Sequence, residues 1–180
     1  MGETEPHLNL PVESLRALTE ASAAINSTLD FETVLAQIAR AARAVTRAEA
    51  SSVLLYDRRR LKLIFAAAVG EHGDWLIGEE FDAELGIAGH VLKSRQAEWV
   101  RDGSTRKDFY PEFDRRISFH TRELLAAPMI HKSEVVGVVE ALNSAGAGPF
   151  EPADLEMLKV FANLAACSTH NAQKHESLKK

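Results

Sequence analysis

Apolar positions between residues 12 and 29 recur at steps of three and four residues, which is the spacing of one helix face. A second stripe of this kind covers residues 31–46 and follows Asp30, whose carboxylate suits a helix N-cap. A third starts at Pro152, a residue favoured in the first turn of a helix, and continues to the end of the chain. The pattern predicts three amphipathic helices, two near the start of the chain and one at its end.

Strand-like runs fill much of the space between these helices. Residues 51–56 and 61–69 flank the polar segment 57–60, and residues 124–130 and 134–143 flank a second polar turn, so two hairpins are predicted. Shorter strands are expected near residues 80–81 and over 98–100, and a loop entering a short helix over 86–92. The predicted fold is α+β, an antiparallel sheet with the terminal helices on one face. Four residues on predicted core faces should be buried: Leu54, Phe65, Val138 and Phe161.

The remaining segment, residues 72–122, is expected to cover the other face of the sheet. Its second half, residues 101–121, mixes polar and aromatic residues without a clean period. Irregular stretches of this length are commonly functional loops or lids. We therefore expect this segment to roof a pocket.

Charge and composition narrow the class of partner. The 180 residues carry a net charge of −5, and their one basic cluster, residues 58–60, lies at a predicted hairpin tip. Neither nucleic acid nor an anionic membrane is therefore expected as a partner. There is no apolar run of transmembrane length and no signal-peptide pattern at the acidic N-terminus, which predicts a cytoplasmic protein or module. We expect a disordered leader over 1–11, one domain over 12–175 and a tail over 176–180.

Enzyme motifs are missing from the chain. It contains no nucleophile elbow, P-loop or His-Glu-x-x-His pair, so a non-catalytic protein is predicted. The single cysteine, Cys167, excludes an intramolecular disulfide, and its place in a helical stripe predicts a buried side chain. A hydrolase remains a weaker alternative, because four roof carboxylates could cluster: Asp102, Asp108, Glu112 and Asp114.

Four motifs, in order, resemble those of the GAF domain family. Residues 49–57 resemble its first strand, residues 86–91 its Gly-Ile-Ala-Gly-x-Val, and residues 119–128 its Phe-x-Thr-Arg-x-Leu-Leu-x-x-Pro. Asn143, Phe150 and Asp154 resemble the closing motif of the family. Two positions differ, because Ser144 stands where the family has a lysine and Leu155 where it has a glutamate. The resemblance covers residues 12–172 and implies a GAF/PAS-like sheet of six antiparallel strands. It also implies terminal helices on one face and a pocket roofed by loops and short helices on the other.

Within the family, the chain looks most like the cyclic-nucleotide-binding domains of phosphodiesterases and adenylyl cyclases. Hydroxyls and backbone N–H groups can hold a phosphate there, while a carboxylate can accept from a purine N–H. The resemblance, together with an expected pocket floor on the central strands, implies a ligand site of Ser52, Ala66, Ile87, Ala88, Tyr110, Asp114, Thr121 and Glu140.

Several positions depart from that subfamily. Alanines 66–68 stand where a base-reading acidic residue is common, Ile117 replaces a roof threonine, and Ser144 removes a lysine that pairs with the motif aspartate. Cyclic GMP and cyclic AMP are therefore expected to bind weakly or not at all, because specificity depends on paired polar groups. No cofactor is assigned. Methionine sulfoxide reduction needs several cysteines and bilin attachment needs one in the pocket, whereas the only cysteine of the sequence, Cys167, is at a helical position. Haem bound through His90 or His120 stays an alternative.

Some of these residues also have purely structural explanations. Gly86 and Gly89 suit backbone geometry, Asp154 suits the start of a helix, and Asn143 suits the turn after its strand. For Ser52, a small strand residue is as good an explanation as a ligand contact.

The function that the resemblance implies is a sensor module of cytoplasmic signal transduction. It would bind a small molecule and signal to an effector through a parallel homodimer of its terminal helices. The alternative is a structural dimerisation module with an empty or self-filled pocket, although the small alanines 66–68 favour an open one. Two near-heptad stripes are expected in the dimer: Leu15, Leu18, Ser22 and Ile25, and Leu158, Ala162, Ala165 and Thr169.

Overall fold

The computed structural model describes residues 12–27 and 30–177, so the predicted leader over 1–11 and the last residues of the predicted tail lie outside it. The helices are α1 (Val12–Ser27), α2 (Phe31–Thr46), α3 (Gly86–Ser94), α4 (Glu112–Ile117) and α5 (Pro152–Ser177), with short 3-10 turns η1 (Gly73–Leu76) and η2 (Gly103–Thr105). The strands are β1 (Ala48–Asp57), β2 (Lys62–Val69), β3 (Glu80–Asp82), β4 (Glu98–Val100), β5 (Leu124–His131) and β6 (Glu134–Ser144).

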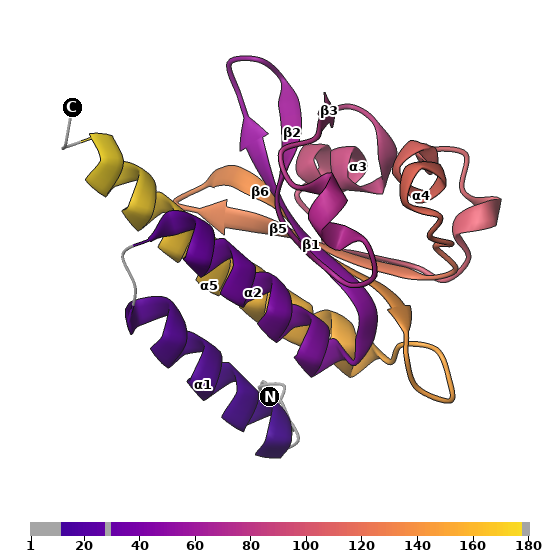
Figure 1. Cartoon of the computed structure of the whole chain (residues 1–180), viewed down its shortest axis with the longest axis horizontal. Coiled ribbons are helices and arrows are strands. Elements are labelled where there is room, and N and C mark those ends of the chain that lie inside the picture. The colour runs from indigo at the N-terminus through magenta and orange to yellow at the C-terminus, as the bar shows by residue number, and fades with distance from the viewer. Residues whose placement is uncertain (1–11, 28–29, 178–180) are drawn as a thin grey trace, which may run out of the picture.

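The strands form one antiparallel sheet in the order β3-β2-β1-β6-β5-β4. Helices α2 and α5 cover one face, and α1 lies outside them as a further layer (Figure 1). The opposite face carries α3, α4 and the loops that join them to β3, β4 and β5 (Figure 1). The predicted α+β architecture is confirmed.

The helices on the covered face begin where the sequence predicts. Asp30 caps α2 by accepting a hydrogen bond from the backbone N–H of Thr33 at 3.0 Å. At the start of α5, Pro152 occupies the first helical position, and Asp154 accepts from the backbone N–H of Glu151 at 2.7 Å. These contacts satisfy backbone donors that the first turn leaves without partners inside the helix.

The sheet separates two hydrophobic cores. Val53 and Val139 face α2 and α5, whereas their neighbours Leu54 and Val138 face the roof, as the alternation of a strand requires. All four residues predicted for the core are buried, with exposed fractions of 1% for Leu54, 6% for Phe65 and 0% for Val138 and Phe161.

A bulge interrupts the alternation on β2. Val53 pairs with Ala67 and the next residue, Leu54, pairs with Phe65, which leaves Ala66 as an extra residue without a partner on β1. Ala66 packs against the helix-side core, while Phe65 and Ala68 belong to the roof side. The expectation that Ala66 lies on the pocket floor is therefore wrong. Ala68 occupies that side of the sheet instead.

The apolar faces that the terminal helices expose are not the ones predicted for a dimer. The stripe Leu158, Ala162, Ala165 and Thr169 is fully buried within the fold, so these side chains are not available to a second copy. Helix α1 instead leaves Val12 81% and Leu15 48% exposed. The expected burial of Cys167 is also wrong, because its side chain lies on the outward face of α5.

Candidate ligand-binding site

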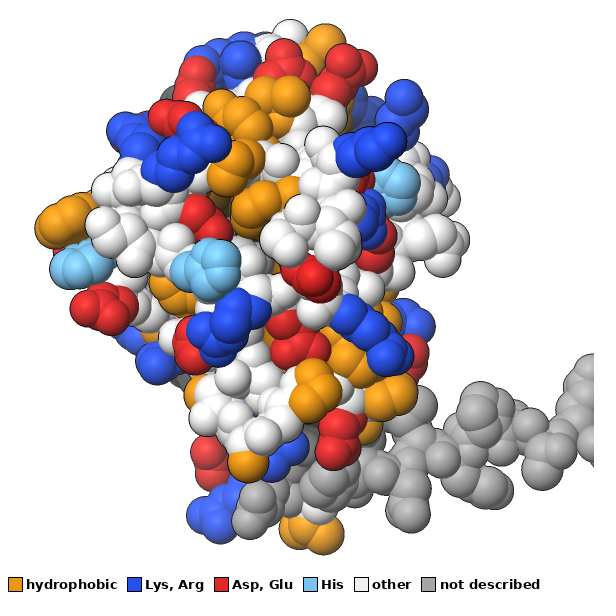
Figure 2. Space-filling model, turned by 90° about the vertical axis from the view of Figure 1, so that its right-hand side faces the viewer, with side chains coloured by type: hydrophobic (Ala, Val, Ile, Leu, Met, Phe, Trp, Pro, Cys, Tyr) orange, Lys and Arg blue, Asp and Glu red, His pale blue; other side chains and the backbone are white. Residues whose placement is uncertain are grey.

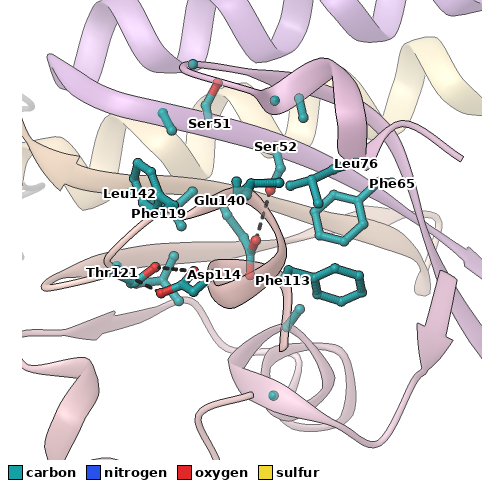
Figure 3. Close-up of a pocket in the computed structure, with 18 of the residues that line it drawn as sticks. Ser51, Ser52, Phe65, Leu76, Phe113, Asp114, Phe119, Thr121, Glu140 and Leu142 are labelled. Carbon is teal, nitrogen blue, oxygen red and sulfur yellow. Dashed lines mark hydrogen bonds between the residues drawn. The ribbon is translucent and has the colours of Figure 1, made fainter. Parts of the chain in front are cut away.

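A cavity of about 100 Å³ lies between the sheet and the roof (Figure 3). Its floor comes from β1, β2 and β6, and its walls come from η1, α3, α4 and the segment before β5. Most lining side chains are apolar, among them Phe65, Leu76, Phe113, Ile117 and Leu142. The polar ones are few, which is typical of a small-molecule site.

Glu140 is the main polar group on the cavity floor. Only 9% of the residue is exposed, and its Oε2 accepts a hydrogen bond from the Ser52 hydroxyl at 2.9 Å. The two residues are paired across β1 and β6, which places both side chains on the roof side (Figure 3). Burial raises the pKa of Glu140 to about 7, because desolvation disfavours the charged form. The hydrogen bond from Ser52 opposes this rise in the pKa, and the nearby Asp114 adds to it.

Asp114 fastens α4 to the segment that leads into β5. Its two carboxylate oxygens accept from the backbone N–H of Thr121 at 2.8 Å and from the Thr121 hydroxyl at 2.9 Å (Figure 3). Burial raises the pKa of Asp114, and the bonds from Thr121 counteract part of that rise. Two predicted ligand contacts therefore bind each other and close one side of the roof.

The glycines of the 86–89 motif allow α3 to start close to its neighbours. Gly86 has a φ of +72°, which favours glycine, and a Cβ on Gly89 would lie 2.7 Å from the carbonyl oxygen of Ala83. Between them, Ile87 and Ala88 are each 3% exposed and line the cavity, as predicted. The N-terminus of α3 faces the same space, so its first N–H groups supply partial positive charge there.

An aromatic cluster forms the wall next to α4. The ring of Phe113 lies 4.8 Å from Phe65, 5.2 Å from Phe81 and 5.9 Å from Tyr110, measured between centroids. Tyr110 lines the cavity, as the sequence predicts, and packs into this cluster. The ring of Phe113 narrows the cavity above Phe65.

Asn143 acts as a clamp behind the site. Its side-chain oxygen accepts from the backbone N–H groups of Arg122 and Glu123 at 2.8 and 3.1 Å. Its amide donates to the carbonyl of His120 at 2.8 Å and to Glu49 at 2.9 Å. Asn143 therefore holds the segment before β5 against β1 and β6, a wider role than the predicted fixing of its own turn.

The rest of the closing motif is structural. Phe150 is buried at 2% exposure, and its N–H donates to Glu123 Oε1 at 3.0 Å. The same oxygen accepts from the Trp99 indole at 2.9 Å, so Glu123 joins β4, β5 and the start of α5. Asp154 serves the start of α5, which confirms its structural explanation.

Seven of the eight predicted site residues line the cavity: Ser52, Ile87, Ala88, Tyr110, Asp114, Thr121 and Glu140. Several apolar residues of the lining were not predicted from the sequence, including Leu76, Phe113 and Phe119. Their only signal was the mixed aromatic and polar character of the roof, which gives no period from which a facing side can be inferred.

The alternatives based on histidines and on clustered carboxylates gain no support from the geometry. His90 and His120 are exposed and do not line the cavity, and His120 borders a separate hollow outside the roof. Asp102 caps η2, Asp108 pairs with Arg106 at 2.7 Å, and Glu112 is exposed, so the roof carboxylates do not form a cluster. Within residues 12–27 and 30–177, no group of three or more His, Cys, Asp or Glu residues could hold a metal ion.

On the outer face of the roof, acidic and basic side chains are interspersed (Figure 2). Arg106 bridges Glu98 and Asp108, and Arg116 pairs with Glu79 at 2.7 Å. These ion pairs join η2 and α4 to neighbouring segments, so both arginines have local acidic partners. Among the helices of the described part of the chain, none is long and apolar enough to cross a membrane.

Comparison with known proteins agrees with this geometry. The family model described as "GAF domain" matches residues 30–168. A probable 3',5'-cyclic phosphodiesterase, pde-5 of Caenorhabditis elegans, is 21% identical over 91% of this chain and 24% of its own length. The alpha' subunit of the mouse (Mus musculus) cone cGMP-specific 3',5'-cyclic phosphodiesterase is 31% identical over 48% of this chain and 10% of its own length. Among solved structures, the GAF domain of an Acinetobacter phosphoenolpyruvate-protein phosphotransferase has a TM-score of 0.78 at 16% identity, covering 93% of this chain and 99% of that one.

The chain belongs to the GAF domain family, because the family model matches well over half of it. GAF domains are regulatory or sensor domains of signalling proteins, where they occur with effector domains. In phosphodiesterase-like proteins the domain itself is regulatory and not catalytic. The chain spans about a quarter or less of the length of these curated relatives.

Proposed function

We propose that residues 12–175 form one sensor domain of cytoplasmic signal transduction that binds a small molecule between the sheet and the roof. The observation that carries this proposal is the cavity itself, which places the buried Glu140–Ser52 pair among apolar walls. Ligand binding there would alter the packing of α3 and α4 on the sheet, whose other face carries the terminal helices. The partner that receives the signal is an effector domain or protein, with neither nucleic acid nor membrane as a partner.

Native mass spectrometry of the purified protein tests whether the cavity holds a small molecule. We expect a retained mass, or a mass taken up from a metabolite mixture, that is lost on unfolding. Failure to retain or take up any small molecule would favour the alternative, a structural module with a self-filled pocket. That alternative has one observation in its favour, since the Phe113 ring already occupies the space above Phe65.

Cyclic nucleotides are a separate test of the same cavity. A ligand at about 100 times its dissociation constant stabilises a fold by about 2.7 kcal/mol, which thermal denaturation detects easily. We expect no such shift with cyclic GMP or cyclic AMP. A shift that disappears in Thr121→Ala but persists in the control Glu112→Ala, an exposed position on α4, would make the chain a cyclic-nucleotide receptor.

For signalling, we propose a parallel homodimer in which the exposed face of α1 meets its copy, next to the outward face of α5. Val12 and Leu15 are large apolar side chains on that face, and a second copy would remove them from water. Light scattering at high protein concentration should give a dimer mass. Leu15→Glu should shift the mass toward the monomer, whereas Gln96→Glu, which adds the same charge at an exposed site outside α1, should not. A monomeric wild type would refute this arrangement.

A further inference from the structure

The charged groups around the cavity all have the same sign. Glu140 contributes a carboxylate from β6, Asp114 one from α4 and Glu71 one from the rim before η1. Among the residues that the structure describes, no lysine, arginine or histidine lines this space. A ligand that enters therefore meets carboxylates without a compensating cation.

The open hydrogen-bonding capacity belongs to Glu140. Both oxygens of Asp114 already accept from Thr121, whereas Glu140 accepts only from the Ser52 hydroxyl among the described residues. An ionised carboxylate can accept about four hydrogen bonds, so Glu140 has sites left for donors. The Glu140 oxygen that Ser52 does not use is not among the sealed side-chain atoms without a partner in the described residues, so it is open to a donor that enters the cavity.

The remaining lining limits the size and polarity of the ligand. The cavity of about 100 Å³ is walled by Leu76, Phe113 and Ile117, and it is smaller than the 300–1,000 Å³ of common ligand pockets. An engineered apolar cavity of about 150 Å³ in another protein accommodates benzene. The space here is smaller than that cavity, so it limits the ligand to a compact apolar body of at most about one ring.

An anion is disfavoured by the same groups. The N-terminus of α3 supplies the equivalent of about half a positive charge, which an anion could use. Glu140 and Asp114 line the same cavity and repel an anion whenever either carboxyl group is ionised. Repulsion between like charges at close range is an effective basis for rejecting a ligand.

We propose that the cavity binds a small nitrogen base, an amine or amidine on a compact apolar body, through N–H bonds to the Glu140 carboxylate. This inference rests on the proposed sensor function and specifies its ligand class. Ser52 holds the carboxylate in place from β1, and the Thr121–Asp114 pair closes the roof beside it. The apolar body lies against the aromatic wall around Phe113.

Isothermal calorimetry at pH 8 with four ring-sized probes tests the ligand class. Benzamidine and benzylamine should bind saturably, benzyl alcohol more weakly, and benzoate not at all. Glu140→Gln keeps an acceptor for Ser52 but removes the charge, so it should weaken benzamidine binding by about tenfold or more. Glu112→Gln, which removes a carboxylate at an exposed position on α4 that does not line the cavity, should change the affinity by no more than about twofold.

The dependence on pH adds a readout that a merely structural role of Glu140 would not change. The groups that face the site are Glu71, Tyr110, Asp114 and Glu140, with His120 acting on Asp114 from outside the roof. The affinity for benzamidine should fall between pH 8 and pH 5.5 as Glu140 takes up a proton. In Glu140→Gln most of this fall should disappear.

Three outcomes would overturn the proposal: benzoate binding as tightly as benzamidine, equal benzamidine affinity in Glu140→Gln, or no saturable binding of either base. In each case a small molecule found by native mass spectrometry would leave the sensor function standing with a different ligand class. If the mass spectra also show no small molecule, the sensor function fails as well.

Discussion

Replacing Glu140 with glutamine should make the protein more stable at neutral and alkaline pH. The fold buries this carboxyl group and raises its pKa from 4.5 to about 7, so the folded chain holds the proton more tightly than the unfolded chain. Stability is therefore greatest when Glu140 is protonated in both states, below about pH 4.5, and it falls as the pH rises toward 7. Above pH 7 the loss is complete and constant.

The size of the effect follows from the difference between the two pKa values. Each unit corresponds to about 1.4 kcal/mol, so a rise from 4.5 to about 7 makes ionised Glu140 cost roughly 3 kcal/mol at pH 8. Glutamine is close to glutamate in size and can still accept the hydrogen bond from Ser52. The variant should therefore lie within about 1 kcal/mol of the wild type near pH 5 and exceed its unfolding free energy by roughly 2–4 kcal/mol at pH 8.

Urea denaturation at pH 5, 6, 7 and 8, followed by circular dichroism, measures this difference. Other groups also make the stability of the wild type depend on pH: the pKa values of Asp114 and Asp154 are raised, and that of His131 is lowered. Both proteins contain these groups, so their effects largely cancel in the difference between the two unfolding free energies. Glu71→Gln controls for loss of a charge at the exposed rim of the cavity. A difference between wild type and Glu140→Gln that stays constant from pH 5 to pH 8 would show that Glu140 is not desolvated in the folded state.

Three further predictions concern the frame of the site. Leu54→Ala and Phe161→Ala should each lower the unfolding free energy by about 2–5 kcal/mol in urea titrations, because both side chains are fully packed; wild-type stability would contradict the core. Asn143→Ala removes three hydrogen bonds to residues 120–123 and a fourth to Glu49, so hydrogen exchange should accelerate over 120–123 first, and unchanged exchange there would contradict the clamp. Gly89→Ala places a Cβ 2.7 Å from the carbonyl oxygen of Ala83 and should lower the melting temperature. The matched change Gly78→Ala has open space around its Cβ position but a φ of +88°, so it measures the effect of backbone strain without a steric clash.

Much of the secondary structure was predictable because it depends on local periodicity. The helix over 31–46 and its cap at Asp30 match the prediction residue for residue, and the strand over 98–100 does so as well. The irregular segment 101–121 was harder, since η2 and α4 are short and held by tertiary contacts such as Asp114 with Thr121. Local sequence carries little signal for turns of this length.

Site residues were predictable from the sequence where strand alternation showed the side of the sheet on which they lie, or where they belong to a recognisable motif. Ser52 and Glu140 lie on neighbouring strands at positions that alternate toward the roof. Ala66 was misplaced because the bulge shifts the alternation by one residue, and only pairing with β1 reveals the bulge. The sequence also does not show whether the apolar stripe of α5 is buried inside the fold or lies at a dimer interface, because the same spacing suits both.

By itself, the sequence determined the long helices, the main strands, the order of the motifs and the family, because periodicity, capping and turn chemistry depend on neighbouring residues. Tertiary structure alone decided which of the apolar stripes is buried, how Asn143 clamps a distant segment, and how strongly burial perturbs Glu140. These properties depend on contacts between residues far apart in the chain. Such contacts exist only after the sheet, its bulge and its roof have assembled.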